Sequence, residues 1–280
     1  MGKITVLGSA AAEGIPAIFC SCRVCTAAWK NGGKDMRLRT AYKLNDRVRI
    51  DFGPDNVAQE YKFQLHSENL KHLFITHSHE DHLRVDELIY RRPGFSVVDE
   101  KNILNIYGNT GVMDVIYAKY AKRRCDFPFY RLNPIEIEAF CPVEIPEEDM
   151  TFYPLKANHM PSERPNFYIV RHGGKWLMIA NDTGYFCEED WVYISALKIR
   201  FDVVITDCTG GVQDIRDGHM SGKYVLVTKE RLESMGCVDG KTRYFINHFS
   251  HNGRLTHAEL EAHYNPHGIQ VCYDGLEIEY

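Results

Sequence analysis

Residues 70–82 read LKHLFITHSHEDH, an apolar run that ends in a cluster of histidines and acids. The run has the composition of a buried strand, so the cluster should follow a strand end. Neutral imidazole and carboxylate are the usual nitrogen and oxygen ligands of zinc and similar metals. His77 and His79 can turn toward one ion, and Asp81 and His82 toward a second ion a few ångströms away. This dense set predicts a two-metal site rather than a solvated polar loop.

Two ions need more ligands than this loop supplies, and the chain offers three more at matching places. His159 follows a strand predicted at 151–156, Asp182 follows one at 176–180, and His248 follows one at 243–247. Each of them alone would more often be a surface residue. Together with the loop they complete the ligand set of a dinuclear centre.

Apolar periodicity predicts the remaining elements. We expect strands at 4–7, 47–51, 70–76, 103–107, 151–156, 167–171, 176–180, 201–207, 243–247 and 269–273, and helices at 56–65, 85–91, 111–123, 223–234 and 257–264. Apolar runs bounded by turns are typical of sheets that helices cover on one face. The sequence therefore predicts a layered α/β sandwich in a single domain, 1–280. The segment 84–150, rich in proline after residue 124, could form a lid or an insertion.

The composition excludes several classes of protein. With 280 residues, 44% hydrophobic and 25% charged, the chain is ordinary globular material with ample core. A formal charge of -5 argues against a sequence-independent nucleic-acid binder, which needs a basic field. We find no run of about 18 apolar residues that would predict a membrane span. We see no export signal and the 9 cysteines are odd in number, so we expect reduced thiols in the cytoplasm.

A second candidate metal site is the sequence CSCRVC at residues 20–25. Its three thiols belong to Cys20, Cys22 and Cys25. Spaced in this way, they can bind one structural zinc and leave room for a fourth ligand. His251 is the preferred fourth ligand because it lies three residues after His248, so that one turn could serve two sites. Cys208, at the end of a predicted strand, is the competing candidate.

Taken together, these motifs resemble the metallo-β-lactamase superfamily, whose fold is a four-layer αββα sandwich. The resemblance implies two divalent ions in the active site, Zn or Mn with Fe as a further option. It assigns His77, His79 and His159 to the first ion, Asp81, His82 and His248 to the second, and Asp182 as a bridge between them. It also implies that Asp51, at the end of the strand predicted at 47–51, orients a ligand loop from behind.

The N-terminal stretch GSAAAEGIPA at residues 8–17, followed by the cysteine motif, is similar to one subgroup of that superfamily. This subgroup is PhnP-like: it contains the phosphonate-pathway cyclic-phosphate phosphodiesterase and the quinone-cofactor biosynthesis protein PqqB. Its members carry a Cys3His structural zinc beside the dinuclear site. The motif TDC around Asp207 and the motif HMS that begins at His219 also match. The resemblance implies that Asp207 supports the ligands and that His219 assists the substrate.

The implied function is a metal-dependent hydrolase that acts on a small or cyclic phosphodiester. A hydroxide formed between two metal ions would attack phosphorus, with Asp81 and Asp182 as part of the catalytic centre. His219 would protonate the leaving alkoxide as a general acid. Arg164 and Arg91 are candidates for binding the phosphate, because a guanidinium matches its geometry.

Three other functions stay open at this point. The chain could be a PqqB-like cofactor-biosynthesis protein, an RNA 3′-processing nuclease, or a carbon-ester or lactam hydrolase. RNA processing would need a basic arm, and the acidic chain shows no such insertion. A small phosphodiester is the expected partner, membrane and nucleic acid are not, and a homodimer is compatible with the sequence.

Overall fold

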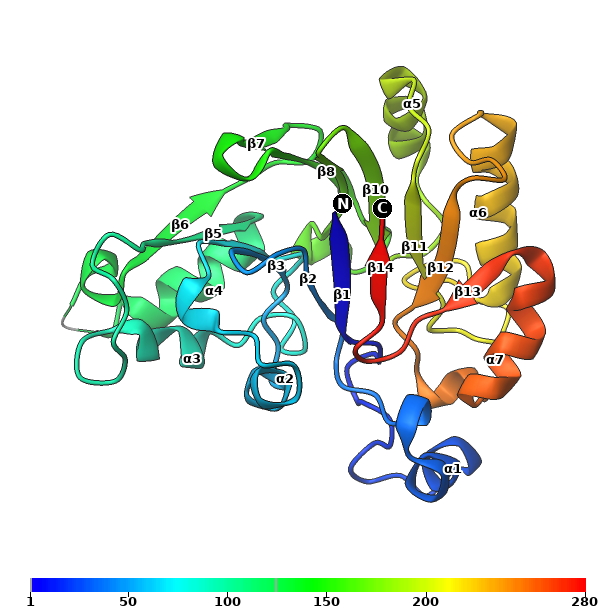
Figure 1. The fold of residues 1–280 in the computed structure, drawn as a ribbon, viewed down its shortest axis with the longest axis horizontal. Coiled ribbons are helices and arrows are strands. Elements are labelled where there is room, and N and C mark those ends of the chain that lie inside the picture. The colour runs from blue at the N-terminus through cyan, green and yellow to red at the C-terminus, as the bar shows by residue number, and fades with distance from the viewer. Residues whose placement is uncertain (1, 124) are drawn as a thin grey trace.

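The computed structural model describes residues 2–123 and 125–280 and places its strands in two seven-stranded sheets (Figure 1). The first sheet has the order β14 (Glu277–Glu279), β1 (Lys3–Gly8), β2 (Ala41–Lys43), β3 (Val48–Ile50), β4 (His72–Phe74), β5 (Leu104–Gly108) and β6 (Leu132–Glu136). The second has the order β13 (Ile269–Val271), β12 (Arg243–Asn247), β11 (Val203–Asp207), β10 (Lys175–Ala180), β9 (Asn166–His172), β8 (Met150–Lys156) and β7 (Val143–Ile145). The last strand pairs with the first, so the two ends of the chain meet in one sheet.

The apolar run that ends in the histidine cluster is buried on both faces. Phe74 of β4 points between the sheets, where its ring stacks on Phe152 of β8 with centroids 3.6 Å apart and on Tyr107 of β5 at 4.3 Å. Leu73 and Ile75 face the other way and join the apolar layer beneath the helices. Burial on both faces explains why this stretch shows no polar alternation.

Helices cover the outer faces of the two sheets. The helices are α1 (Arg23–Asn31), α2 (Asn56–Phe63), α3 (Val85–Leu88), α4 (Thr110–Tyr120), α5 (Glu188–Leu197), α6 (Gly222–Ser234) and α7 (His257–Tyr264). Figure 1 shows α2, α3 and α4 beside the first sheet, and α6 and α7 along the second. The predicted four-layer αββα sandwich is confirmed. No helix in residues 2–123 or 125–280 has both the length and the apolar character to cross a membrane.

The parallel strands of both sheets bring distant residues to one edge. In the first sheet β3, β4 and β5 run parallel, and in the second β10, β11 and β12 do so. Their carboxyl ends therefore open at the same sheet edge, which is where ligand sites form in such folds. Most of the candidate ligands follow these strands, and His159 follows β8, which runs in the same direction as β10 because both are antiparallel to β9.

The expected strands and helices are present with small shifts of their boundaries, and the structure adds several elements. Helix α5 escaped prediction because its first turn is Glu188, Glu189 and Asp190, which hides the apolar positions Trp191 and Ile194. Helix α1 begins within the cysteine motif, so Cys25 lies in its first turn rather than in a loop. The short strands β2 and β14 carry too few residues for a periodic signal.

The segment 84–150 is more integral to the fold than a lid or an insertion. Strands β5 and β6 complete the first sheet, α4 covers them, and β7 forms an edge of the second sheet. The apolar side chains of α4, among them Val112, Met113 and Ile116, pack on β4 and β5. Removal of this segment would therefore expose the outer core of the first sheet.

Candidate metal centre and active-site cleft

One group of side chains gathers around the histidine loop after β4. It consists of His77, His79, His159 and Asp182, each with one ligand atom within 4.8 Å of the others. Nε2 of His77 lies 2.9 Å from Nδ1 of His79 and 3.3 Å from Oδ2 of Asp182. Nε2 of His159 lies 3.3 Å from the same nitrogen of His79. Lone-pair donors that converge in this way surround one position suited to a cation.

A second group shares a carboxylate with the first. It consists of Asp81, His82, Asp182 and His248, again within 4.8 Å, and all four are buried. Oδ2 of Asp182 lies 2.8 Å from Nε2 of His82 and 3.6 Å from Nε2 of His248. The same oxygen faces His77 of the first group at 3.3 Å. Asp182 is thus placed to bridge two neighbouring cations, the arrangement that a dinuclear centre requires.

Residues on the side away from the candidate metal positions contact the imidazole rings of His82, His159 and His248, so that one nitrogen of each ring faces the centre. Nδ1 of His82 donates to Asp51 at 2.7 Å, and Nδ1 of His159 donates to the Gly218 carbonyl at 2.9 Å. Nδ1 of His248 lies 2.8 Å from Oγ1 of Thr209. Such partners fix the tautomer that leaves Nε2 free as a ligand.

The residues present fit a metal pair. Nε2 of His82, Nε2 of His248 and Oδ1 of Asp182 are buried, and although other polar atoms lie close, none forms a hydrogen bond of acceptable geometry among the described residues. Orphaned polar atoms inside a protein are costly unless an ion or water satisfies them. Burial, followed by the charge of His82, lowers the pKa of His77 well below its usual value, which keeps this imidazole in the neutral form that binds metal.

Left-handed backbone conformations occur at three residues of this site. The φ angles are 63° at Asp51, 54° at Asp182 and 62° at His248, although none of these residues is glycine. This conformation costs a non-glycine residue about 1–2 kcal/mol. Strain of this kind is concentrated at functional sites, where the surrounding structure maintains it. The sequence carries no local signal for it.

His219 lies next to the second group. Its Nδ1 is 3.3 Å from Oδ2 of Asp207 and 3.3 Å from Oδ1 of Asp182. Burial disfavours the charged ring, but the hydrogen bond and the charge of Asp207, together with Asp182, outweigh it and raise the pKa of His219 to about 9. A cation bound nearby would oppose this rise. The geometry leaves His219 partly exposed beside the ligands, where it can meet a substrate.

Asp207 organises this side of the centre. Its buried carboxylate accepts hydrogen bonds from the backbone N–H of Asp182 at 3.1 Å and of Met220 at 3.0 Å. Nδ1 of His248 lies 3.3 Å from the same carboxylate. Asp207 therefore contacts a ligand backbone, a ligand ring and His219 at once.

A cleft of about 580 Å³ opens above the two groups. Its walls are Ala11, Ala12, Glu13, His79, Asp81, His159, Asp182, Thr209, Gln213, Ile215, His219, His248, Ser250, Asn252 and Arg254. The volume is in the range of small-molecule sites. Glu13, Gln213, Asn252 and Arg254 were absent from our sequence-based candidates, because nothing local distinguishes them from ordinary loop residues.

The two predicted phosphate-binding arginines lie elsewhere. Arg164 lines a neighbouring cavity of about 710 Å³ that shares His159 with the cleft. Arg91 belongs to neither wall, and its Nη2 donates to the Asn102 carbonyl at 3.0 Å. The prediction for Arg91 is wrong, because the short helix that carries it turns the guanidinium into the fold.

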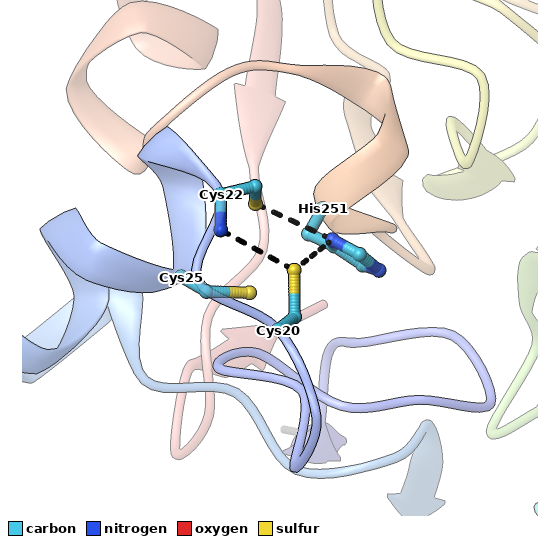
Figure 2. A group of neighbouring side chains, drawn as sticks. All are labelled: Cys20, Cys22, Cys25 and His251. Carbon is cyan, nitrogen blue, oxygen red and sulfur yellow. Dashed lines mark hydrogen bonds between the residues drawn. The ribbon is translucent and has the colours of Figure 1, made fainter.

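The cysteine motif meets the other end of the chain (Figure 2). Cys20, Cys22 and Cys25 come from the loop before α1 and from its start, and His251 comes from the 3-10 turn His251–Gly253. Nδ1 of His251 lies 3.2 Å from Sγ of Cys20 and 3.4 Å from Sγ of Cys22. Cys208 does not join this group: its thiol donates to the Tyr264 hydroxyl in the core at 3.2 Å.

The thiols differ in acidity, which suits a site that is completed by a cation. Burial opposes ionisation of Cys22, but the Cys25 backbone N–H and His251 lower the pKa of this thiol to about 6. Burial is the main reason why the pKa of Cys25 rises to about 12. A zinc ion deprotonates coordinating thiols outright, so three thiolates beside one imidazole fit a tetrahedral zinc.

Comparisons with known proteins agree with this architecture. Residues 46–242 match the sequence model of the beta-lactamase superfamily domain. A diphosphatase from the PhnP family superposes with a TM-score of 0.75 at 21% identity, covering 100% of this chain and 98% of that chain. Zn2+-bound PqqB from Methylobacterium extorquens gives 0.72 at 17% identity, covering 99% and 100%. At such identities these two likenesses show the fold alone.

One curated protein matches in sequence. It is an octanoyltransferase from Porphyromonas gingivalis (strain ATCC BAA-308 / W83), 25% identical over 283 residues. The match covers 98% of this chain and 51% of that protein. The chain thus spans about half the length of this curated relative.

Proposed function

The chain belongs to the beta-lactamase superfamily, and we propose that within it the protein is a metal-dependent hydrolase of a small or cyclic phosphodiester. One observation carries the proposal: Asp182 lies between two sets of converging ligand atoms and belongs to both. Shared carboxylates of this kind hold two ions together, and paired ions stabilise the attacking and leaving oxygens of an in-line displacement. Zn and Mn both suit the histidine and aspartate ligands, and the Cys3His group would hold a structural zinc.

When bound, the two ions would supply a hydroxide at neutral pH and positive charge for the phosphoryl oxygens. The remaining steps fall to the side chains. Protonated His219 lies beside Asp182, where it can donate a proton to the leaving alkoxide. Asp207 keeps the ring charged and oriented through its 3.3 Å contact with Nδ1. Asp51 and Thr209 hold the rings of His82 and His248 in place.

The diphosphatase from the PhnP family supports phosphoryl chemistry as an analogy of fold. The curated relative suggests a second candidate function. Its name, octanoyltransferase, concerns acyl groups, and the same cleft could hydrolyse a carbon ester or a thioester. A hydroxide of this kind attacks carbonyl carbon as well as phosphorus.

Hydrolysis assays with matched variants test the proposal. The protein is loaded with Mn2+ or Zn2+ and offered bis(p-nitrophenyl) phosphate, 2′,3′-cyclic AMP and an octanoyl thioester. We expect turnover of the phosphodiesters that Asp182→Ala abolishes. Arg91→Gln, which lies outside the cleft, should keep the wild-type rate. Turnover of the thioester with no phosphodiester activity would replace the first proposal by the second.

A further inference from the structure

Arg254 stands out among the residues that line the active-site cleft. Of the lining residues described, it is the one with a permanent positive charge. The residue is exposed, and within the described ranges its guanidinium has no carboxylate partner. The acidic wall residue Glu13 is engaged elsewhere: it accepts from Ser250 and lies 3.4 Å from Nε2 of His251. A free guanidinium in a cleft beside a metal centre indicates an anion-binding role.

The backbone of Arg254 is anchored on two sides. It directly follows the 3-10 turn His251–Gly253, whose histidine contacts the thiols of Cys20 and Cys22. Its carbonyl accepts from the Arg23 guanidinium, which also pairs with Glu259 at 2.8 Å. The cysteine cluster and helix α1 therefore determine where the Arg254 side chain enters the cleft.

Arg254 ends the 3-10 turn His251–Gly253 in a left-handed backbone conformation. Its φ angle is 65°, in the left-handed region that favours glycine. The neighbouring Gly253 packs closely against the backbone of Thr209 and Gly211. The same left-handed conformation ends helices α2 and α5 at Gln64 and Lys198, so what distinguishes Arg254 is its place in the cleft and its free charge.

From this geometry we propose that Arg254 binds a second phosphate of the substrate, apart from the phosphoryl group held at the metal centre. The inference rests on the proposed function and narrows its substrate class to phosphoric esters or anhydrides with a second phosphate, such as diphosphate diesters. The guanidinium fork matches two phosphate oxygens at once. With ions bound, the metal centre would attract one phosphate, and Arg254 would attract the second within the same cleft of about 580 Å³.

Binding of AMP and ADP to the metal-loaded protein tests whether Arg254 binds a second phosphate, and it does so without relying on turnover. Isothermal titration calorimetry would compare the wild type with Arg254→Gln and Arg254→Gly. The glycine variant suits the positive φ, so its Tm should equal or exceed that of the wild type. Arg171→Gln is the charge-matched control, because Arg171 is exposed on β9 and lines neither cavity.

We expect the wild type to prefer ADP over AMP about tenfold, equivalent to about 1.4 kcal/mol. Both Arg254 variants should reduce this preference to less than about twofold, and Arg171→Gln should keep it. Three outcomes would overturn the inference. In the first, the wild type shows no preference for ADP, and in the second, both Arg254 variants keep the preference. In the third, the preference disappears in Arg164→Gln instead of in the Arg254 variants. Absence of phosphodiester turnover with the preference intact would refute the proposed function and leave the role of Arg254 standing.

Discussion

Replacement of His219 by glutamine tests how the leaving group departs. The imidazole lies 3.3 Å from both Asp182 and Asp207, beside the ligands and partly open to the cleft. Glutamine keeps a polar side chain of similar reach but cannot deliver a proton. The variant should therefore lose rate on substrates whose alkoxide must be protonated, and keep its metals.

The size of this loss follows from general acid catalysis. Burial opposes the charged ring, but Asp207 and Asp182 raise the pKa of His219 to about 9 in the metal-free protein, and bound cations would lower this pKa toward the working pH. General acids typically contribute 10²–10⁴-fold, most when their pKa is near the working pH. For His219 we expect a contribution of about 10²–10³-fold, or roughly 3–4 kcal/mol. The wild-type rate on such substrates should also fall as the pH rises through the pKa of the ring, where His219 loses its proton.

Two substrates separate this role from a structural one. The nitrophenolate of bis(p-nitrophenyl) phosphate leaves without protonation, whereas ring opening of 2′,3′-cyclic AMP expels an alkoxide. His219→Gln should lower kcat by about 10²–10³-fold on the cyclic ester and by less than about tenfold on the aryl ester. Asp214→Asn, in the same polar loop but paired with Lys223 at the surface, is the control and should leave both rates unchanged. Metal content is measured for each variant.

Equal losses on the two esters would refute the reasoning. They would show that His219 acts through the metal centre, for example as a ligand beside Asp207 and His248, a grouping that its position permits. The reasoning would also be refuted if His219→Gln hydrolysed the cyclic ester as fast as the wild type does.

Three further predictions concern other parts of the molecule. Cys22→Ser should reduce the metal content from three ions per chain to two, as metal analysis would measure. The accompanying loss of about 2–3 kcal/mol of stability should lower Tm by roughly 3–5 °C in thermal unfolding. Burial raises the pKa of Asp190 from 3.8 to about 6, so the folded state holds a proton that the unfolded state releases. The wild type should therefore lose about 3 kcal/mol of stability relative to Asp190→Asn as the pH rises from about 4 to 6. Urea unfolding of the two proteins across this pH range should show a growing difference in free energy of unfolding. A difference that stays constant with pH would contradict the prediction. Phe152→Ala removes a ring stacked between the sheets and should cost about 3–5 kcal/mol in urea unfolding, with the metal content unchanged at low urea.

The layered architecture and the ligand types could be predicted because their signals are local. Apart from His72, the stretch 72–75 that contains β4 is apolar since both of its faces are buried, and that pattern is readable without knowledge of its neighbours. The ligand candidates each follow such a strand, so their order along the chain already indicated one edge of a sheet. Helix α5 was missed because its acidic first turn, suited to a helix start, hides the two buried positions that follow.

What the sequence by itself determined was therefore the chemistry available: histidines and carboxylates at strand ends, and three thiols near the N-terminus. Tertiary structure alone decided how that chemistry is combined. It placed Asp182 between two ligand groups, turned Arg91 away and brought Arg254 into the cleft. The physical reason is that a side chain's destination depends on the loop backbone and on contacts with residues far away in the chain. No periodicity within a few residues of Arg91 or Arg254 encodes those contacts.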